Sequence, residues 1–212
     1  MTRVTVNTHP QHGTPTQAVL ASSNSGKLAE LQAMLHGLDM DILPQSRFAV
    51  PEVAETGLSF VENALIKARH CAEHTGLPAI ADDSGLVVDA LHGAPGIYSA
   101  RYAGAGATDE QNVRKLLNDI NGVPQAQRGA RFYCVLVFLR HARDPMPVIS
   151  EGAWEGYILD APAGSGGFGY DPVFFVPDQG CSAAQLAAPV KNRISHRGQA
   201  LARLTALLGI QA

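Results

Sequence analysis

The segment that decides the fold spans residues 78–85 and has the sequence PAIADDSG. Its short apolar run follows Gly76 and ends at two adjacent carboxylates, Asp82 and Asp83, which predicts a buried β-strand with an acidic end. Ligands of α/β proteins gather at such sheet edges. Adjacent carboxylates repel each other unless a cation or a proton lies between them, and Mg²⁺, which often brings phosphates, is the usual cation among oxygen ligands. The alternative is a polar turn in which either acid caps the residues from Leu86 onward.

Length and composition restrict the class of protein. The chain has 212 residues, of which 46% are hydrophobic, so it can build a sizeable core. Its formal net charge of −3 offers no electrostatic basis for binding a nucleic-acid polymer. Cys71, Cys134 and Cys181 form no CxxC pair, so we expect no structural zinc or disulfide framework, and a reducing, cytoplasmic location fits. Residues 1–16 are polar and resemble a flexible extension and not a signal peptide, and no segment approaches a membrane span.

Strand and helix signals alternate along the chain without an internal repeat or a linker. Strands are expected over 18–21, 40–43, 78–82, 131–141 and 148–159, with 85–91 as a hairpin partner of 78–82. Helices are expected over 26–36, from the capping box of Ser59 and Glu62 to about Gly76, from the capping box of Thr108 and Gln111 to about 120, near 182, and over 196–208. This alternation predicts one α/β domain with a mixed sheet over residues 17–212.

Residues 22–27, with the sequence SSNSGK, lie between the first expected strand and helix, where a phosphate-binding loop would lie. They are not a Walker A motif, because Ala21 takes the place of the first glycine and Leu28 follows the lysine. A helix N-terminus still directs free N–H groups at an anion, and Lys27 adds a positive charge. The alternative is a simple Ser/Asn N-cap.

Residues 70–74, with the sequence HCAEH, match the HxxEH pattern of inverted zinc proteases. His70 and His74 fall on one polar stripe of the expected helix together with Asn63 and Lys67. A solvated helix face explains this stripe, so we interpret the match as a chance occurrence and not as a zinc site.

Two further segments carry groups that could bind a base or an anion. Residues 163–167, at the start of a run to 172, nearly match the GxSxG elbow, but Ala163 replaces the first glycine and no strand leads directly into it, so a serine hydrolase is not expected. The glycines there let backbone approach a ligand, and Phe168 offers a face for stacking; the alternative is a mobile surface loop. Residues 191–198, KNRISHRG, place cations where they oppose a helix dipole, which suggests binding of an anion or of a keto edge; the alternative is a solvated basic turn.

Together and in this order, the segments resemble the inosine/xanthosine triphosphate pyrophosphatase family, and its bacterial branch most closely. The resemblance covers nearly everything after Gln17, and the ordered set is far more specific than any single motif. The matching segments are 22–27, 55–57 with Phe60, 62–64, 67–68, 81–86, 93–102, 167–172 and 194–198.

The resemblance implies an elongated, two-lobed α/β domain around a central mixed sheet flanked by helices, and a homodimer. It implies Mg²⁺-dependent hydrolysis of deaminated purine nucleoside triphosphates, ITP, dITP and XTP, to the monophosphate and pyrophosphate, which would cleanse the nucleotide pool. Two alternatives stay open: another phosphate enzyme, such as a phosphatase or a pyrophosphatase for modified pyrimidine nucleotides, and a non-catalytic nucleotide-binding regulator.

The resemblance also implies roles for single residues. Asp83 resembles the general base and a magnesium ligand, Glu55 resembles a second ligand, and Asp82 supports the pair. The expected substrate-binding residues are Ser22, Ser23, Asn24, Ser25, Gly26, Lys27, Lys67, Ser84, Phe168, Gly169, Tyr170, Asp171, Lys191, His196 and Arg197. Two residues depart from the family pattern: Ala54 stands where an acid is common, and Ser23 lacks the freedom of the usual glycine.

Overall fold

The computed structural model describes residues 17–22, 24–35 and 40–209. The expected extension over 1–16 and the loop residue Ser23 therefore lie outside the described residues. Within the described part of the chain, no helix combines the length and apolar character needed to cross a membrane.

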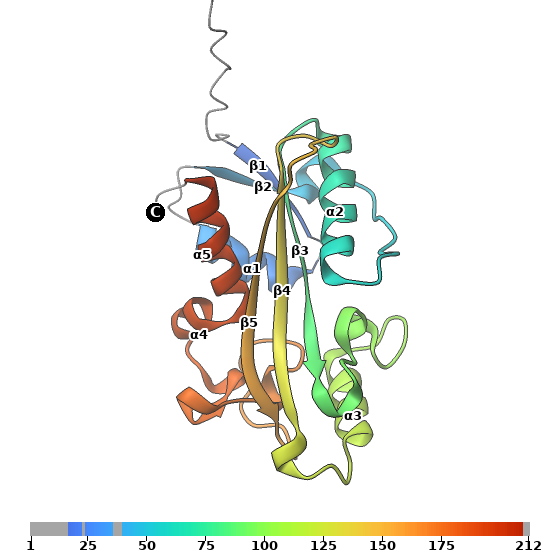
Figure 1. Cartoon of the computed structure of the whole chain (residues 1–212), viewed down its shortest axis with the longest axis vertical. Coiled ribbons are helices and arrows are strands. Elements are labelled where there is room, and N and C mark those ends of the chain that lie inside the picture. The colour runs from blue at the N-terminus through green and yellow to red at the C-terminus, as the bar shows by residue number, and fades with distance from the viewer. Residues whose placement is uncertain (1–16, 23, 36–39, 210–212) are drawn as a thin grey trace, which may run out of the picture.

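A seven-stranded mixed sheet with the order β2-β1-β3-β4-β5-β6-β7 forms the centre of the protein (Figure 1). β2, β1 and β3 are parallel, and each later neighbour along the sheet pairs antiparallel. The strands are β1 (Gln17–Ala21), β2 (Asp41–Pro44), β3 (Ala79–Val88), β4 (Gly129–Leu139), β5 (Val148–Ile158), β6 (Phe174–Val176) and β7 (Cys181–Ser182). The predicted α/β class with a mixed sheet is confirmed.

Helices cover both faces of the sheet. The α-helices are α1 (Ser25–Leu35), α2 (Phe60–Thr75), α3 (Asp109–Asp119), α4 (Ala188–Ile194) and α5 (His196–Leu208). The 3₁₀ helices are η1 (Gln45–Phe48), η2 (Asp89–Leu91), η3 (Gly96–Arg101), η4 (Gln125–Gln127), η5 (Asp171–Val173), η6 (Pro177–Gln179) and η7 (Ala183–Gln185). Both expected capping residues act as such: Ser59 accepts from the Glu62 amide, and Thr108 and Gln111 form a reciprocal box.

The two faces of the sheet carry different cores, as the alternation of strand side chains requires. On one face, the even-numbered residues of β1, β3 and β4, which include Ile80 and Leu136, pack under α1 and α5. On the other face, the odd-numbered residues of these strands, which include Ala81 and Val135, pack under α2. A third core around Phe132, Trp154 and Phe174 joins α3 to the far end of β3–β5. The long strands thus connect an upper lobe with a lower one (Figure 1).

Strand β3 differs from the expected arrangement. The sequence predicts a strand ending at Asp82 and a hairpin partner over 85–91, but β3 continues through both acids to Val88 and pairs with β4 at every residue. Gly85 is not a turn residue: a Cβ there would collide with the Gly96 carbonyl oxygen and with Ser99 Oγ, so the glycine lets η3 pack against the strand. The strand that ends beside the acids is β1, whose last residue Ala21 pairs with Ala81.

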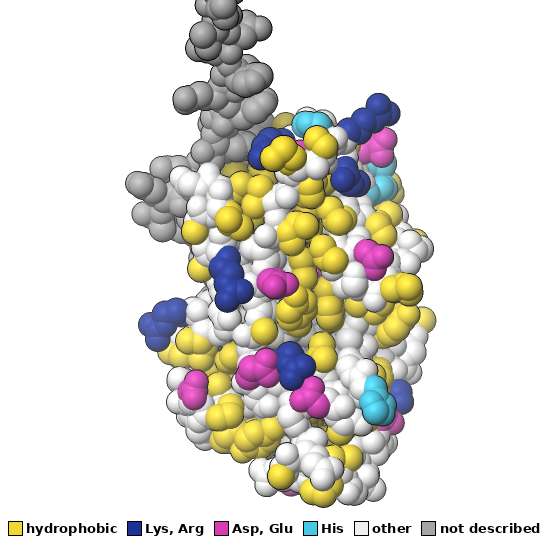
Figure 2. Space-filling model, viewed as in Figure 1, with side chains coloured by type: hydrophobic (Ala, Val, Ile, Leu, Met, Phe, Trp, Pro, Cys, Tyr) yellow, Lys and Arg dark blue, Asp and Glu magenta, His cyan; other side chains and the backbone are white. Residues whose placement is uncertain are grey.

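For the basic segment 191–198, the alternative of a solvated basic turn is wrong. It contains the end of α4 and the start of α5, and Ser195 is at once the C-cap of the first helix and the N-cap of the second. On the face seen in Figure 2, lysines and arginines are interspersed with acids and form no continuous basic surface.

Candidate active site

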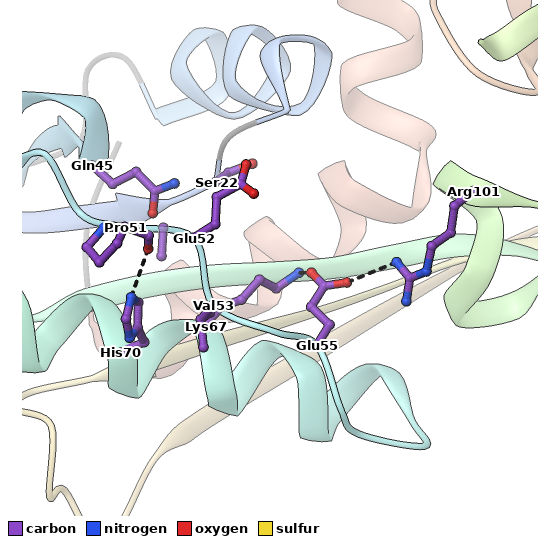
Figure 3. A pocket seen from close by; sticks show the side chains of 10 residues that line it. Ser22, Gln45, Pro51, Glu52, Val53, Glu55, Lys67, His70 and Arg101 are labelled. Atoms are coloured by element: carbon purple, nitrogen blue, oxygen red, sulfur yellow. Dashed lines mark hydrogen bonds and ion pairs between the residues drawn. The ribbon is translucent and has the colours of Figure 1, made fainter. Parts of the chain in front are cut away.

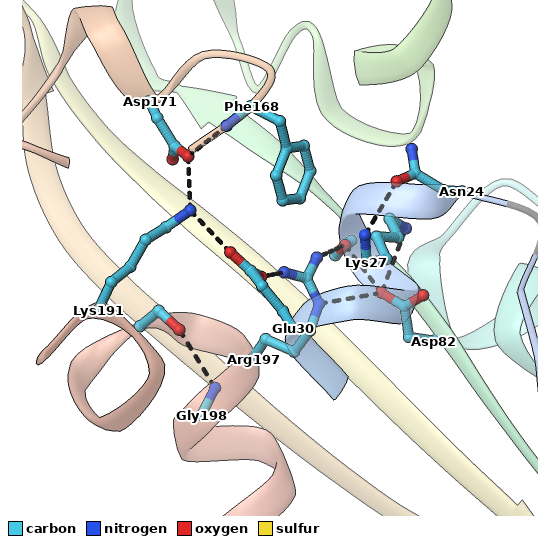
Figure 4. A network of polar contacts seen from close by, with 11 residues as sticks. Asn24, Lys27, Glu30, Asp82, Phe168, Asp171, Lys191, Arg197 and Gly198 are labelled. Atoms are coloured by element: carbon cyan, nitrogen blue, oxygen red, sulfur yellow. Dashed lines mark hydrogen bonds and ion pairs between the residues drawn. The ribbon is translucent and has the colours of Figure 1, made fainter. Parts of the chain in front are cut away.

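The two carboxylates on β3 point to opposite faces of the sheet. Asp82 is 1% exposed and lies 3.2 Å from Lys27 Nζ of α1 and 3.7 Å from Arg197 Nε of α5 (Figure 4). Asp83 is 5% exposed and its Oδ1 accepts a 2.9 Å hydrogen bond from Lys67 Nζ of α2. Strand alternation produces this separation, so the adjacent acids do not share one cation as their spacing in the sequence suggests.

The opposite environments drive the two carboxyl groups apart chemically. Burial alone would raise the pKa of Asp82, but Lys27, Arg197 and Lys67 outweigh it and hold that pKa well below its ordinary value. Burial raises the pKa of Asp83, and the opposing charges of Lys67 and Lys27 do not fully cancel the rise. Asp82 is therefore a fixed anion, whereas Asp83 is the carboxylate with the greater tendency to accept a proton.

Glu55, Lys67 and Asp83 form a connected cluster beside the end of β1. Lys67 Nζ lies 2.9 Å from Asp83 Oδ1 and 2.8 Å from Glu55 Oε1. Arg101 of η3 approaches the other oxygen of Glu55, Oε2, at 3.6 Å, and Figure 3 shows Glu55 between Lys67 and Arg101. Burial opposes ionisation of Glu55, but Lys67, Lys27 and Arg101 lower its pKa. The cluster lines a cavity together with Asn24, Lys27 and Ser84, which provides both cations for phosphates and carboxylates for a metal ion.

The donor set fits Mg²⁺ bound jointly with a phosphate. Asp82 Oδ1 and Asp83 Oδ2 are buried carboxylate oxygens without a hydrogen-bond partner among the described residues. No group of three His, Cys, Asp or Glu side chains in that part of the chain is arranged to hold a metal ion. Mg²⁺ commonly uses one or two carboxylates and takes its other ligands from phosphates and water, so a pair of carboxylates is a sufficient share for the protein.

The stripe on α2 is solvated only at its far end, where His74 is exposed. Asn63 is fully buried and its Oδ1 accepts a 2.8 Å hydrogen bond from the Gly57 amide, which positions the segment that carries Glu55. Lys67 belongs to the acidic cluster. His70 Nε2 contacts the Pro51 carbonyl oxygen at 2.8 Å, and His74 Nδ1 contacts the His70 carbonyl oxygen at 2.9 Å. The HxxEH match therefore has a role in the fold, since the histidines bind backbone oxygens.

The segment expected to bind phosphate contains the N-cap of α1 and also lines the cavity. Asn24 Oδ1 accepts from the Lys27 amide at 3.0 Å, so the residue caps α1, and it lines the cavity as well. Ser22 is nearly buried at the same end of β1. A Cβ on Gly26 would lie 2.9 Å from the Phe168 ring, so this glycine allows the aromatic ring to lie against the start of α1.

A second cavity adjoins the acidic cluster and is lined by aromatic rings and buried cations. The Phe168 ring centroid lies 5.0 Å from Lys191 Nζ and 5.8 Å from Arg197 Cζ, and His196 and Phe132 line the same cavity. His196 stacks on Phe132 with ring centroids 4.9 Å apart. Burial, with Arg197 and Lys191 nearby, lowers the pKa of His196 far below its ordinary value, so its ring is neutral.

The buried cations of this cavity are held by carboxylates. Lys191 Nζ lies 2.5 Å from Asp171 Oδ2 and 2.8 Å from Glu30 Oε1, and Arg197 pairs with the other oxygen of Glu30 (Figure 4). Arg197 Nη2 also donates to Ser84 Oγ at 3.0 Å. Glu30 therefore sets the orientation of both cations, although Lys191 and Arg197 come from different helices.

The two cavities share Asn24, Lys27 and Ser84, so they form one continuous site. A family model described as the Ham1 family matches residues 18–207. The chain belongs to the Ham1 family. The resemblance found in the sequence is thereby confirmed.

Relatives and solved structures of high similarity agree with this assignment. The dITP/XTP pyrophosphatase of Photobacterium profundum is 59% identical over 190 residues, which cover 90% of this chain and 96% of the relative. The dITP/XTP pyrophosphatase of Shigella flexneri is 59% identical over 185 residues, 87% of this chain and 94% of the relative. The structure of a HAM1 protein from Coxiella burnetii superposes with a TM-score of 0.85 at 51% identity and covers 91% of this chain and 98% of its own.

In this Ham1-family chain, the predicted site residues whose side chains are described surround the two cavities or contact a residue that does. Ser23 lies outside the described residues, and Ser25 begins α1. Three residues of the site were not predicted from the sequence. Arg101 contacts Glu55, Glu30 pairs with Arg197, and Phe132 stacks on His196. The spacing of Lys27 and Glu30 on one helix was a signal for Glu30, because residues three apart share a face. The sequence carries no comparable signal for Phe132, which lies in an apolar strand.

Proposed function

We propose that this chain is a nucleoside-triphosphate pyrophosphatase that hydrolyses ITP, dITP and XTP to the monophosphate and pyrophosphate. One observation carries the proposal: a cavity lined by Phe168 and by the buried side chains of Lys191, His196 and Arg197 adjoins the carboxylate–lysine cluster, with which it shares Asn24, Lys27 and Ser84. Only a ligand with a flat ring at one end and phosphates at the other uses both parts. The names of the relatives from Photobacterium profundum and Shigella flexneri support the same activity.

The chemistry we propose assigns one role to each carboxylate. Asp83 accepts a proton from the attacking water, because its pKa is raised and its Oδ2 is free of other partners among the described residues. Asp83 and Glu55 would hold Mg²⁺, which when bound neutralises charge on the phosphate oxygens. Lys27 and Lys67 bind the triphosphate, and Asp82 stays ionised to orient Lys27 and Arg197. Attack at the α-phosphorus releases pyrophosphate as the leaving group.

Selection of the base would rest on the buried donors of the cavity beside Phe168, which we call the ring cavity. Hypoxanthine and xanthine carry an acceptor oxygen at position 6, which N–H groups of this cavity can meet, whereas adenine presents a donor amine. Adenine would leave buried donors unpaired at a cost of about 1–3 kcal/mol each. The family resemblance and the fixed cations of the ring cavity together favour a 6-oxopurine over a modified pyrimidine.

A nucleotide panel with Mg²⁺, in which pyrophosphate and phosphate are measured separately, tests the proposal. We expect pyrophosphate from ITP, dITP and XTP and little turnover of ATP. Release of phosphate alone would indicate a phosphatase, and tight binding without turnover would indicate a regulator. ATP turnover equal to that of ITP would contradict the base selection.

We also propose that the protein is a homodimer. Leu58 and Tyr98 are 85% and 53% exposed and border one groove together with the glycine-proline segment 93–96. Large apolar side chains at such exposure are typical of protein interfaces. Light scattering should return twice the 22.4 kDa of one chain, and a mass of 22.4 kDa would contradict the dimer.

A further inference from the structure

The position of Phe168 depends on a glycine-rich segment with open space on both sides. Phe168 and Gly169 line the ring cavity, which also contains Lys191, His196 and Arg197. They also line a separate cavity that faces α3 and is bordered by Val113 and Leu117. Gly167 and Gly169 have φ values of +72° and +61°, so the backbone here adopts the left-handed conformation that glycine tolerates. The Phe168 ring lies against Gly26 at the start of α1, but the cavity toward α3 leaves the other side of the segment unpacked, so polar contacts are needed there to fix its position.

The polar contacts at the two ends of the segment do not hold its centre. Gly166 N donates to the Ala184 carbonyl oxygen at 3.0 Å, and the Tyr170 hydroxyl donates to the Ser99 carbonyl oxygen at 2.8 Å. Phe168 N donates to Asp171 Oδ2 at 2.9 Å, but that carboxylate is only three residues further along the same segment. This bond shapes the turn, and it reaches another element only indirectly, because the same carboxylate oxygen pairs with Lys191 of α4.

The centre is tied to the rest of the protein by a residue far away in the sequence. Gly169 N donates a 2.7 Å hydrogen bond to Asp109 Oδ2, and Asp109 is the first residue of α3. Asp109 is exposed, and among the described contacts this is the one hydrogen bond of its side chain. A charged acceptor on a rigid helix makes this bond stronger than one between neutral groups.

We infer that Asp109 is a positioning residue, which holds the Phe168–Gly169 segment in place over the ring cavity so that Phe168 can stack on the base. This inference rests on the proposed function for the identity of the ligand. The contact itself rests on the fold alone. Loss of the carboxylate lets the segment move toward α3, which weakens binding of the base. The cavity lined by Glu55, Lys67 and Asp83 stays unchanged.

The test compares Asp109→Ala with the matched control Glu110→Ala. Glu110 is the next residue, is also exposed and carries the same charge in the first turn of α3, but the described hydrogen bond of the Gly169 amide goes to Asp109 and not to Glu110. Both changes remove one favourable charge from the helix N-terminus, so a general effect on α3 appears equally in both. Asp109→Asn keeps an acceptor oxygen without the charge and serves as the conservative variant.

For Asp109→Ala we expect KM for ITP to rise about tenfold, as for a lost charge-assisted hydrogen bond, with kcat changed less than about twofold. Inhibition by IMP should weaken by the same factor, and inhibition by inorganic pyrophosphate should not change. Asp109→Asn should fall between the wild type and Asp109→Ala, and Glu110→Ala should match the wild type. Equal KM values for Asp109→Ala and Glu110→Ala would overturn the inference, as would equal weakening of pyrophosphate inhibition.

A measurement without nucleotide separates this inference from the proposed function. Hydrogen exchange of the Gly169 amide should be about tenfold faster in Asp109→Ala than in the wild type or in Glu110→Ala, because its acceptor is gone. An unchanged exchange rate of the Gly169 amide would overturn the positioning role of Asp109 even if ITP is the substrate. Faster exchange in Asp109→Ala, in a protein that does not cleave ITP, would support the positioning role of Asp109 and refute the proposed function.

Discussion

Asp82 and Asp83 are consecutive residues of β3, yet their carboxylates contact cations from opposite faces of the sheet. Asp82 faces α1 and α5, and Asp83 faces α2 and the segment that carries Glu55. The strand thereby delivers one anion to each wall of the site, and the different cation sets lower one pKa and leave the other raised. We expect the two positions to respond differently to the same substitution.

Asp83→Asn should lower kcat for ITP by ~10²–10⁴-fold, the range for loss of a general base. The raised pKa of Asp83 means that protonation begins at higher pH than for an ordinary aspartate, so the wild-type rate falls as the pH drops through that value. The acid limb of the pH–rate profile should be absent in the residual activity of the variant. A folded variant with a tenth of the wild-type rate would move the role to Glu55 or Asp82.

Chelation of divalent cations should abolish turnover, and added Mg²⁺ should restore it. Glu55→Gln removes one of the two proposed carboxylate ligands, so the Mg²⁺ concentration for half-maximal activity should rise by at least about tenfold. Titration of activity with Mg²⁺ at saturating ITP measures this shift. Full activity in the presence of chelator, or an unchanged Mg²⁺ requirement in the variant, would contradict the proposed metal site.

Arg197 and Lys27 should affect different parts of the substrate. Arg197→Ala would remove one of the two cation partners of Asp82 and of Glu30, so Arg197→Lys is the better test because it keeps the charge and removes the planar fork. It should lower kcat/KM for ITP more than that for residual ATP, whereas Lys27→Ala should lower both alike. Equal losses for both nucleotides in Arg197→Lys would place that side chain on the phosphates.

Gly26→Ala should weaken binding of ITP without lowering the stability of the protein. Alanine favours a helix by about 0.5–1 kcal/mol over glycine, so α1 and the free energy of unfolding should be unharmed. The added Cβ lies 2.9 Å from the Phe168 ring, which must move, so KM for ITP should rise. Denaturant unfolding and initial rates give the two values. An unchanged KM would show that the ring position does not matter for binding.

Asp144 should contribute to stability in a pH-dependent manner. It is 2% exposed and accepts from the Arg140 and Met146 amides at 3.0 and 2.9 Å, at the turn between β4 and β5. Burial opposes its ionisation, but these bonds and Arg140 lower its pKa, so its contribution is present above the ordinary aspartate pKa and is lost as the pH falls through the folded-state value. Asp144→Asn should reduce the free energy of unfolding by about 1–2 kcal/mol at pH 7.

The difference between wild type and Asp144→Asn should shrink toward zero at acid pH, where both side chains are neutral. Asp178→Asn, at an exposed position of η6, is the control and should leave stability unchanged at both pH values. A gap for Asp144→Asn that is equally large in acid would indicate a packing effect and not an electrostatic one.

Local patterns in the sequence were sufficient for much of the fold. The capping boxes at Ser59 and Thr108 located two helices, because their bonds join residues three apart. The apolar runs located β1, β4 and β5 to within about two residues, the usual uncertainty of element ends. The ordered motifs also identified the family, since each one is a short contiguous segment.

The tertiary structure decided what depends on partners distant in the chain. The sequence around Asp82 and Gly85 favours a strand end and a turn, but pairing with β4 along its whole length keeps β3 extended. Asn63 and Lys67 share a polar stripe with no sign of burial in the sequence, and only the packing of the segment around Glu55 encloses them. The contacts of Glu30 with Arg197 and of Asp109 with Gly169 join residues 167 and 60 positions apart. Such pairs form only when the sheet brings α1 next to α5 and α3 next to the glycine-rich segment, because no local pattern encodes a distance in space.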